Sequence, residues 1–110
     1  MNVIPQFDPI IHAPLRLQTC AILTSAAEVE FALIRDTLKV SDSVLSKHLK
    51  QLEDAGYVAV RKGPRGGRVR TWLSFTAVGR RNFAAHVAEL QRLAGAIAAA
   101  RCPMSCQYNQ

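Results

Sequence analysis

Residues 41–71 constrain the fold more than any other stretch, because a helical pattern gives way there to a strand pattern. The first half, SDSVLSKHLKQLEDAG, places apolar residues at three- and four-residue spacing, which predicts a helix with one buried face. Ser41 can cap the first turn with its hydroxyl, and Gly56 supplies the left-handed residue that ends such a helix. The predicted buried stripe consists of Val44, Leu45, Leu49 and Leu52.

The opposite face of this predicted helix carries small polar and basic side chains, namely Ser43, Ser46, Lys47, Lys50 and Gln51. Hydroxyl and ammonium groups can donate to phosphate oxygens or to base edges. A solvated surface explains such a face equally well, since exposed polar faces are the norm for helices. His48 lies on the same helix, and both a DNA contact and packing against a neighbouring helix remain open for it.

The second half, YVAVRKGPRGGRVRT, predicts a β-hairpin. Residues 57–62 and 69–75 are rich in β-branched and aromatic side chains, which is typical of strands. Gly63, Pro64, Gly66 and Gly67 interrupt the pattern, so we expect a loop there.

Positive charge is concentrated in this hairpin, which contains Arg61, Lys62, Arg65, Arg68 and Arg70. No acidic residue lies between Asp54 and Glu89, whereas seven of the fourteen Lys and Arg residues do. A long block of one sign beside a polar helix indicates a polyanionic partner. A merely basic loop is the alternative.

These motifs resemble those of a known family. The run from Arg16 to Leu90 resembles the winged helix-turn-helix domain of bacterial MarR/ArsR-type transcriptional regulators. VSDSVLSKHLKQLEDAGYV resembles the recognition helix and the start of the wing, and GPRGGRVRTWLSFTAVGR resembles the wing and the start of the next helix. FDPIIHAPLRLQTCAIL resembles the N-terminal segment of a small-regulator subgroup. The resemblance implies an α+β fold, mainly helical with a small β-hairpin, that binds double-stranded DNA.

The rest of the helix-turn-helix is predicted upstream. Residues 30–38 form its first helix, with an inner stripe of Phe31, Ile34 and Leu38. A short strand within residues 25–29 is expected to pair with the wing. The two-residue link at 39–40 forces the helices to cross steeply, which lifts the second one outward toward a major groove.

Both ends of the chain favour a homodimer. Asp8 and Pro9 start a helix, Pro14 interrupts or restarts it, and the apolar density up to residue 24 exceeds what one core face needs. Thr76 caps a long final helix, and the apolar face of this helix would be exposed to solvent in a monomer. Pairing with a second copy is expected, with folding back on its own subunit as the alternative. The expected dimer contacts are Ile10, Leu17, Phe83, Val87, Leu90, Leu93 and Ile97.

Size and charge bound the remaining possibilities. A chain of 110 residues predicts one domain, here residues 1–100 with a tail at 101–110. A formal charge of +6 and a pI near 9.8 favour an acidic partner. Neither a membrane-spanning stretch nor a signal peptide is evident, so we expect a cytoplasmic protein without a membrane partner.

The cysteines suggest a sensor only weakly. Cys102 and Cys106, with His86 upstream, invite a metal or redox interpretation, but their spacing is no strong zinc signature. We therefore expect no metal and no cofactor, and we expect Cys20 to be a core residue. No catalytic constellation is present, which predicts that the protein is not an enzyme.

The sequence thus predicts a sequence-specific DNA-binding transcriptional regulator, a repressor that binds a pseudo-palindromic operator as a homodimer. The alternatives are a metal- or redox-gated sensor using Cys102 and Cys106, and a winged-helix protein-interaction module without DNA binding. The resemblance makes Arg16 a candidate phosphate contact, with a structural ion pair or cap as the alternative, and leaves an unidentified small-molecule effector as a further partner. The candidate DNA contacts are Arg16, Ser41, Ser43, Ser46, Lys47, His48, Lys50, Lys62, Arg65, Arg68 and Arg70.

Overall fold

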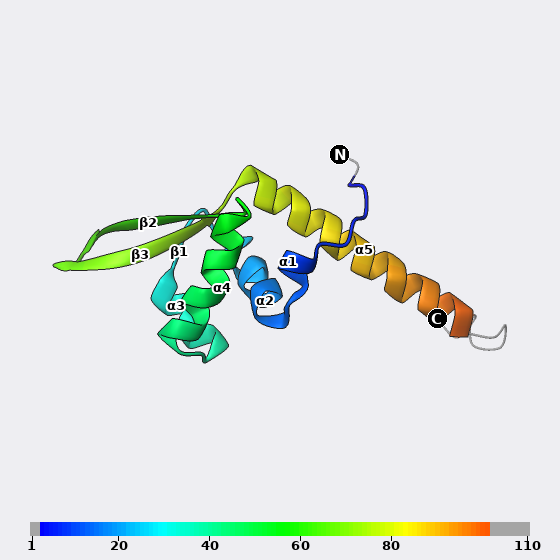
Figure 1. Cartoon of the computed structure of the whole chain (residues 1–110), viewed down its shortest axis with the longest axis horizontal. Helices are drawn as coiled ribbons and strands as arrows, with labels where there is room; N and C mark the ends of the chain where they lie inside the picture. Colours follow the sequence, from blue (N-terminus) through cyan, green and yellow to red (C-terminus); the bar gives the residue numbers. More distant parts are fainter. Residues whose placement is uncertain (1–2, 102–110) are drawn as a thin grey trace.

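The computed structural model describes residues 3–101 and has the expected α+β architecture (Figure 1). Its elements, in chain order, are α1 (Pro9–His12), α2 (Pro14–Leu23), β1 (Val29–Glu30), α3 (Phe31–Leu38), α4 (Asp42–Asp54), β2 (Val58–Arg65), β3 (Arg68–Phe75) and α5 (Ala77–Arg101). The hairpin projects from one end of the molecule and α5 from the other, so the chain spans 63 × 28 × 21 Å.

Local signals set the helix boundaries at the N-terminus. Asp8 caps α1, its Oδ1 accepting from the backbone N–H of Ile10 at 2.9 Å, and Pro9 takes the first helical position. Pro14 begins α2 and does not continue α1, because proline lacks the N–H that an interior position needs. The predicted helix start and the predicted interruption are both confirmed.

The helix-turn-helix consists of α3 and α4. Lys39 adopts a left-handed conformation (φ 57°) in the link between them, and Ser41 caps α4 by accepting from Val44 N at 3.2 Å. Leu45, Leu49 and Leu52 are buried as predicted. Val44 was predicted to be buried with them, but it remains 42% exposed. The buried face of α4 is therefore narrower than the apolar pattern predicted.

The sheet is antiparallel with strand order β1-β3-β2, so the predicted short strand does pair with the wing, although it lies at Val29–Glu30. The expected loop at residues 63–67 is wrong in extent. Gly63 and Pro64 lie within β2, and only Gly66 and Gly67 turn the chain, with φ of 59° and 79°. A two-residue turn of this kind requires positive φ at both positions. Pro64 is tolerated because β2 is an edge strand.

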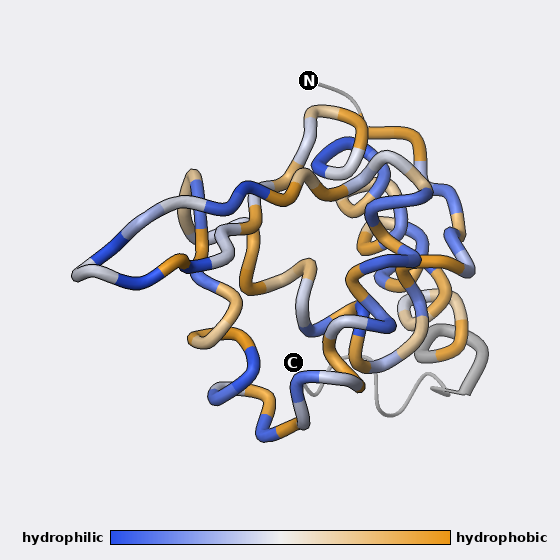
Figure 2. The backbone as a smooth tube through the Cα atoms, turned by 60° about the vertical axis from the view of Figure 1, so that its left-hand side comes forward, coloured by the Kyte–Doolittle hydropathy of each residue, from blue (hydrophilic) through white to orange (hydrophobic). Residues whose placement is uncertain are grey.

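The core lies where α1, α2, α3 and α4 meet the inner part of the sheet. It contains Ile11, Cys20, Leu23, Val29, Ile34, Leu45, Leu49, Leu52, Val58, Leu73 and Phe75. The prediction for Cys20 is confirmed, and burial raises the pKa of its thiol to about 12. Figure 2 shows the mostly hydrophilic outer part of the hairpin standing away from this core.

Thr76 fixes the start of α5. Its Oγ1 accepts from Gly79 N at 3.0 Å, which confirms the predicted cap, and its hydroxyl donates to the carbonyl of Gly56 at 2.7 Å. One side chain therefore joins the start of the last helix to Gly56, two residues beyond the end of α4.

Candidate nucleic-acid interface

The face of α4 opposite its buried stripe is exposed to solvent, as the sequence predicted. Ser43, Ser46, Lys47, Lys50 and Gln51 are all exposed. Lys50 Nζ lies 3.5 Å from Asp54 Oδ1, one turn along the helix, and both side chains are largely solvated. Such a pair contributes little energy and can exchange for a phosphate. Within residues 3–101, Lys47 makes no ion pair.

A groove separates α4 from the hairpin. It encloses about 410 Å³ and is lined by Ser46 and Lys50 of α4 and by Lys62 and Thr71 of the hairpin. Its walls also carry the carboxylates of Asp42 and Glu53. Lys62 is therefore the hairpin cation that shares a surface with the recognition helix.

The hairpin arginines occupy the other face of the ribbon. Successive side chains alternate between faces, and the register pairs Arg61 with Trp72, Gly63 with Arg70, and Arg65 with Arg68. The four arginines and Trp72 thus share one face, whereas Lys62 lies on the face that lines the groove. The sequence predicted one cationic hairpin; the strand register divides it into two surfaces.

Acidic residues of the N-terminal half hold three of these arginines. Glu28 accepts from Arg61 Nε and Nη2, both at 2.8 Å, and this contact lowers the pKa of the Glu28 carboxyl. Glu30 lies 3.6 Å from Arg65 Nη1 and 3.2 Å from Arg70 Nη1. The charge of the hairpin is thus partly neutralised by two acids that lie 33 to 40 residues upstream of the arginines they pair with.

The remaining arginine, Arg68, makes no ion pair within the described residues and is exposed beside the turn. Arg65 is 64% exposed and weakly paired, so it also stays accessible. Arg70 is half-buried against Glu30 and belongs to the sheet more than to its surface. The guanidinium groups of Arg61 and Arg65 stack over Trp72, 5.6 and 5.5 Å from the ring centre.

Arg16 links helices in this structure. Its Nη1 lies 3.0 Å from His48 Nδ1 on α4, and its Nε donates to the carbonyl of Ile10. These contacts join Arg16 to α1 and α4, and its predicted phosphate contact stays a prediction. Burial, then the charges of Arg16 and Lys47, lowers the pKa of His48. Ser41 is likewise engaged as the cap of its own helix.

Sequence reasoning missed a polar junction between the N-terminal segment and α5. Asp8 donates its backbone N–H to His86 Nδ1 at 2.9 Å and accepts from the Tyr57 hydroxyl at 2.6 Å. His86 Nε2 lies 3.1 Å from His12 Nδ1. Because Asp8 and His86 are 78 residues apart, no local signal marks the contact. A cavity of about 310 Å³ beside it is lined by residues that include Phe7 and Asn82.

This junction corrects the earlier suggestion that His86 might join a metal site. His86 is fully buried and both of its ring nitrogens are occupied by hydrogen-bond partners. Cys102 and Cys106, the other residues of that suggestion, lie outside the described residues. Within residues 3–101 there is no group of three His, Cys, Asp or Glu side chains that could hold a metal ion.

A capped helix presented outward by a tight turn, followed by a β-hairpin, defines a winged helix-turn-helix protein, a class that binds DNA. Comparison with known families agrees: the profile described as "Winged helix DNA-binding domain" matches residues 15–94. The chain belongs to this family. In the part of the chain that the structure describes, no helix is both long and apolar enough to span a bilayer.

One protein is similar to this chain in sequence, and solved structures are similar to it in fold. An uncharacterized protein of Methanocaldococcus jannaschii, MJ0432, is 32% identical over 84 residues, covering 76% of this chain and 91% of that protein. A transcriptional regulator homologue of Pyrococcus horikoshii OT3 has a TM-score of 0.75 at 24% identity, covering 80% of this chain and 87% of that one. ZitR of Lactococcus lactis, described as a zinc-responsive MarR family member, has a TM-score of 0.60 at 18% identity, covering 88% of this chain and 67% of that one. The resemblance to MarR-type regulators is thus confirmed for the fold.

Proposed function

We propose that this protein is a sequence-specific, double-stranded DNA-binding transcriptional regulator that represses as a homodimer. The observation that carries the proposal is the solvated Ser/Lys face of α4, which shares a groove with Lys62 of the wing. Two such helices, one from each protomer, would enter successive major grooves about 34 Å apart on a pseudo-palindromic site. A dimer bound across a promoter excludes polymerase, and no catalytic step is part of this function.

Each candidate residue has a defined part in the proposal. Ser43, Ser46 and Lys47 face base edges or adjacent phosphates. Lys50 and Lys62 bind the phosphates of the DNA strand that runs along the groove between α4 and the hairpin. Arg65 and Arg68 beside the turn reach the flanking minor groove, where a narrow tract concentrates negative potential. Arg16, Ser41, His48 and Arg70 act by supporting these residues, because each makes a hydrogen bond or an ion pair within the protein.

The homodimer is supported by apolar surface at both ends of the chain. Ile10 on α1 and Leu93 on α5 are each 37% exposed, and Ile97, also on α5, is 55% exposed. Helix α5 extends well beyond the body of the protomer (Figure 1). Leu17 and Phe83 pack against the core of their own protomer, so we leave them out of the proposed interface. Val87 and Leu90 lie between these sets and are half-buried.

One cavity of the protein offers a binding place for a small-molecule effector. The cavity beside Phe7, Asp8, Tyr57 and Asn82 lies between the N-terminal segment and α5, next to the residues that join α4 to the wing. A small molecule there would contact both the proposed dimer region and the DNA-binding region. An effector of this kind should protect Tyr57 from chemical modification and should also release the protein from DNA. A compound that does both would be identified as the effector.

Salt dependence tests the DNA-binding proposal directly. Binding to duplexes selected from genomic DNA should weaken steeply between about 50 mM and about 200 mM salt, because phosphate contacts release counterions. Arg68→Gln should lower the slope of log K against log salt by about 0.9 per protomer. Fluorescence anisotropy at several salt concentrations measures both quantities.

Arg61→Gln is the matched control, since it removes the same charge from the same face of the hairpin. Glu28 already neutralises Arg61 through two short hydrogen bonds, so its replacement should change the slope far less. A wild-type protein that binds no duplex at low salt and co-purifies with another protein would favour the interaction-module alternative.

The oligomeric state tests the second part of the proposal. Ile97→Asp should shift the protein from dimer to monomer at micromolar concentration, because it places a charge on the exposed apolar stripe of α5. Sedimentation equilibrium measures the shift. Ala84→Asp is the control: Ala84 is exposed on the same helix but lies roughly 140° around the axis from Ile97. A wild-type protein that is already monomeric contradicts the homodimer.

A further inference from the structure

The three histidines of the chain all use ring Nδ1 in a hydrogen bond. His86 Nδ1 faces the backbone N–H of Asp8, which can only donate, so this nitrogen carries no proton. Neutral His86 therefore holds its proton on Nε2 and donates it to His12 Nδ1, 3.1 Å away. His12 in turn must leave its own Nδ1 unprotonated.

His48 is constrained in the same way. A guanidinium is always a donor, so the 3.0 Å contact with Arg16 Nη1 requires an unprotonated His48 Nδ1. If any of the three rings were protonated, two N–H donors would face each other and the hydrogen bond between them would be lost. The hydrogen bonds seen here thus exist only when His12, His48 and His86 are neutral.

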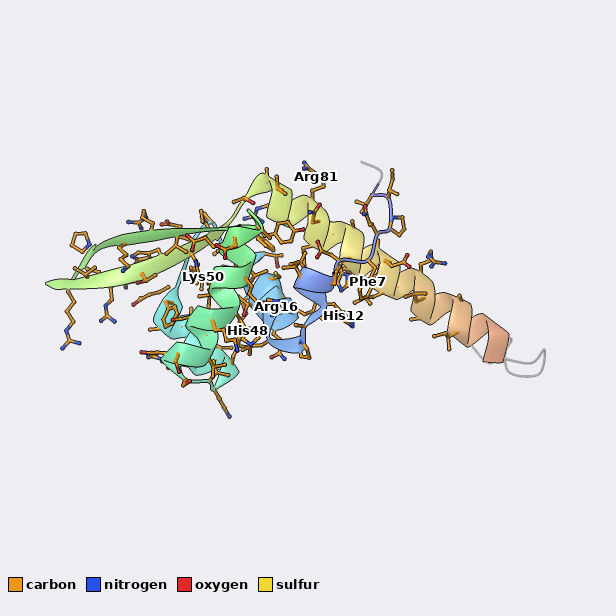
Figure 3. All side chains as sticks on the ribbon, viewed as in Figure 1. Phe7, His12, Arg16, His48, Lys50 and Arg81 are labelled. Carbon is orange, nitrogen blue, oxygen red and sulfur yellow. The ribbon has the colours of Figure 1, made fainter. Side chains whose placement is uncertain are left out.

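These contacts connect the long helix to the recognition helix. His86 lies on α5 and His12 on α1, while Arg16 of α2 binds both the Ile10 carbonyl of α1 and His48 of α4. In Figure 3, the labelled side chains of Phe7, His12 and Arg16 lie between α5 and α4, and His48 lies on α4. The set of contacts from His86 through His12 and Arg16 to His48, here called the histidine path, spans the elements that place α4 relative to α5.

We propose that His12, His48 and His86 position the recognition helix only in their neutral forms, so that proton uptake below neutral pH weakens DNA binding. This inference rests on the proposed DNA-binding function. Arg16 and the histidines act here as positioning residues, and none of them needs to touch DNA. The proposal gives the protein a response to acidification that its fold alone does not imply.

The groups that surround His48 and His86 lower the pKa values of these two rings and so favour their neutral forms. Burial, then the neighbouring His12, lowers the pKa of His86, and the Asp8 carboxylate opposes this as the smallest of the three causes. His48 faces Arg16 and Lys47, which add to the effect of burial in lowering its pKa. Burial raises the pKa values of Tyr57, whose hydroxyl binds Asp8, and of Cys20, so neither of these groups charges near neutrality.

The sign of the pH effect follows from these directions. The folded pKa values of His48 and His86 lie below the ordinary value of 6.5. The stabilisation that depends on neutral rings is therefore complete above pH 6.5 and is lost as the pH falls below it. Charge alone predicts the opposite for DNA affinity, because up to three added positive charges would strengthen attraction to phosphates. Loss of the neutral-ring contacts predicts weaker DNA binding at low pH, whereas added positive charge predicts tighter binding. The direction in which DNA affinity changes therefore separates the two effects.

The experiment measures affinity for one selected duplex by anisotropy at about pH 7.5 and about pH 5.5, at constant ionic strength. Wild-type protein should bind more weakly at the lower pH, by up to about tenfold for each pH unit over which one coupled proton is taken up. In the variant with His12→Asn and His86→Asn, each asparagine oxygen can accept near the former Nδ1 position but cannot titrate. The ratio of the two affinities should shrink to about threefold or less.

Two further measurements complete the test. Glu89→Gln removes a carboxylate of α5 outside the histidine path and should keep the wild-type ratio. NMR titration of the histidine ring protons of the wild-type protein should give pKa values for His48 and His86 below 6.5, independently of DNA. Affinity that is unchanged or tighter at the lower pH overturns this inference while leaving the DNA-binding proposal intact. Absence of binding at both pH values overturns the proposed function, and this inference with it.

Discussion

Replacing Lys47 with glutamine should weaken DNA binding by about a hundredfold without altering the fold. Lys47 is exposed on the recognition face of α4 and makes no ion pair within the described residues, so its full charge is available to DNA. A good contact with a base edge contributes about 1–3 kcal/mol, and a homodimer loses two of them. The slope of log K against log salt should also fall by about 0.9 for each lost phosphate contact.

A matched control separates position from net charge. Gln91→Glu lowers the net charge by the same amount, but Gln91 is exposed on α5, away from the groove between α4 and the wing. Anisotropy should show less than about a threefold loss for this variant, because charges farther from the duplex than a Debye length are screened. Equal losses for the two variants would mean that the protein attracts DNA by its overall charge and that α4 has no special role.

The elements of this fold were predictable where a local residue determines the backbone. Asp8, Ser41 and Thr76 each cap the helix that follows them, and the hydrogen bonds of all three are present. The exposure of Lys47 and Lys50 followed from helical periodicity in the same way. These features depend on residues within one turn of each other, so sequence spacing is sufficient to find them.

Contacts between distant segments were not predictable. The pairing of Arg61 with Glu28 joins residues 33 positions apart, and the contact between His12 and His86 joins residues 74 apart. Charge counting found that the cations are concentrated in one hairpin but did not assign them to a face. Strand register, which the sequence did not determine, divides them between two faces and brings Glu30 to Arg65 and Arg70.

The same limit explains the two local errors. Val44 fits the apolar stripe of α4 by spacing, but the residues that would cover it do not reach that edge of the helix, and it stays exposed. Gly63 and Pro64 resemble loop residues by type, yet pairing with Arg70 and Val69 extends the strand through them. In both cases tertiary neighbours decide the outcome.

Gly79→Ala should destabilise the protein by about 3 kcal/mol, although alanine is intrinsically the better helix former by about 1 kcal/mol. A Cβ at position 79 would collide with the backbone carbonyl oxygen of Tyr57 and lie 2.8 Å from Phe75 Cδ1. The carbonyl cannot move aside easily, because it already accepts from Thr76 N at 3.1 Å. Urea denaturation followed by circular dichroism measures the change.

Gly95→Ala on the same helix is the control, since an added Cβ there meets no atom of the described residues within 4 Å. It should stabilise the protomer by about 0.5–1 kcal/mol, so the two identical substitutions should act in opposite directions. The contrast tests the packing on which the interface depends. Gly79 lets α5 approach the turn at Tyr57, and that approach brings His86 to Asp8 and keeps the wing in place beside α4. If Gly79→Ala is neutral, α5 does not pack closely there, and the histidine path loses its support.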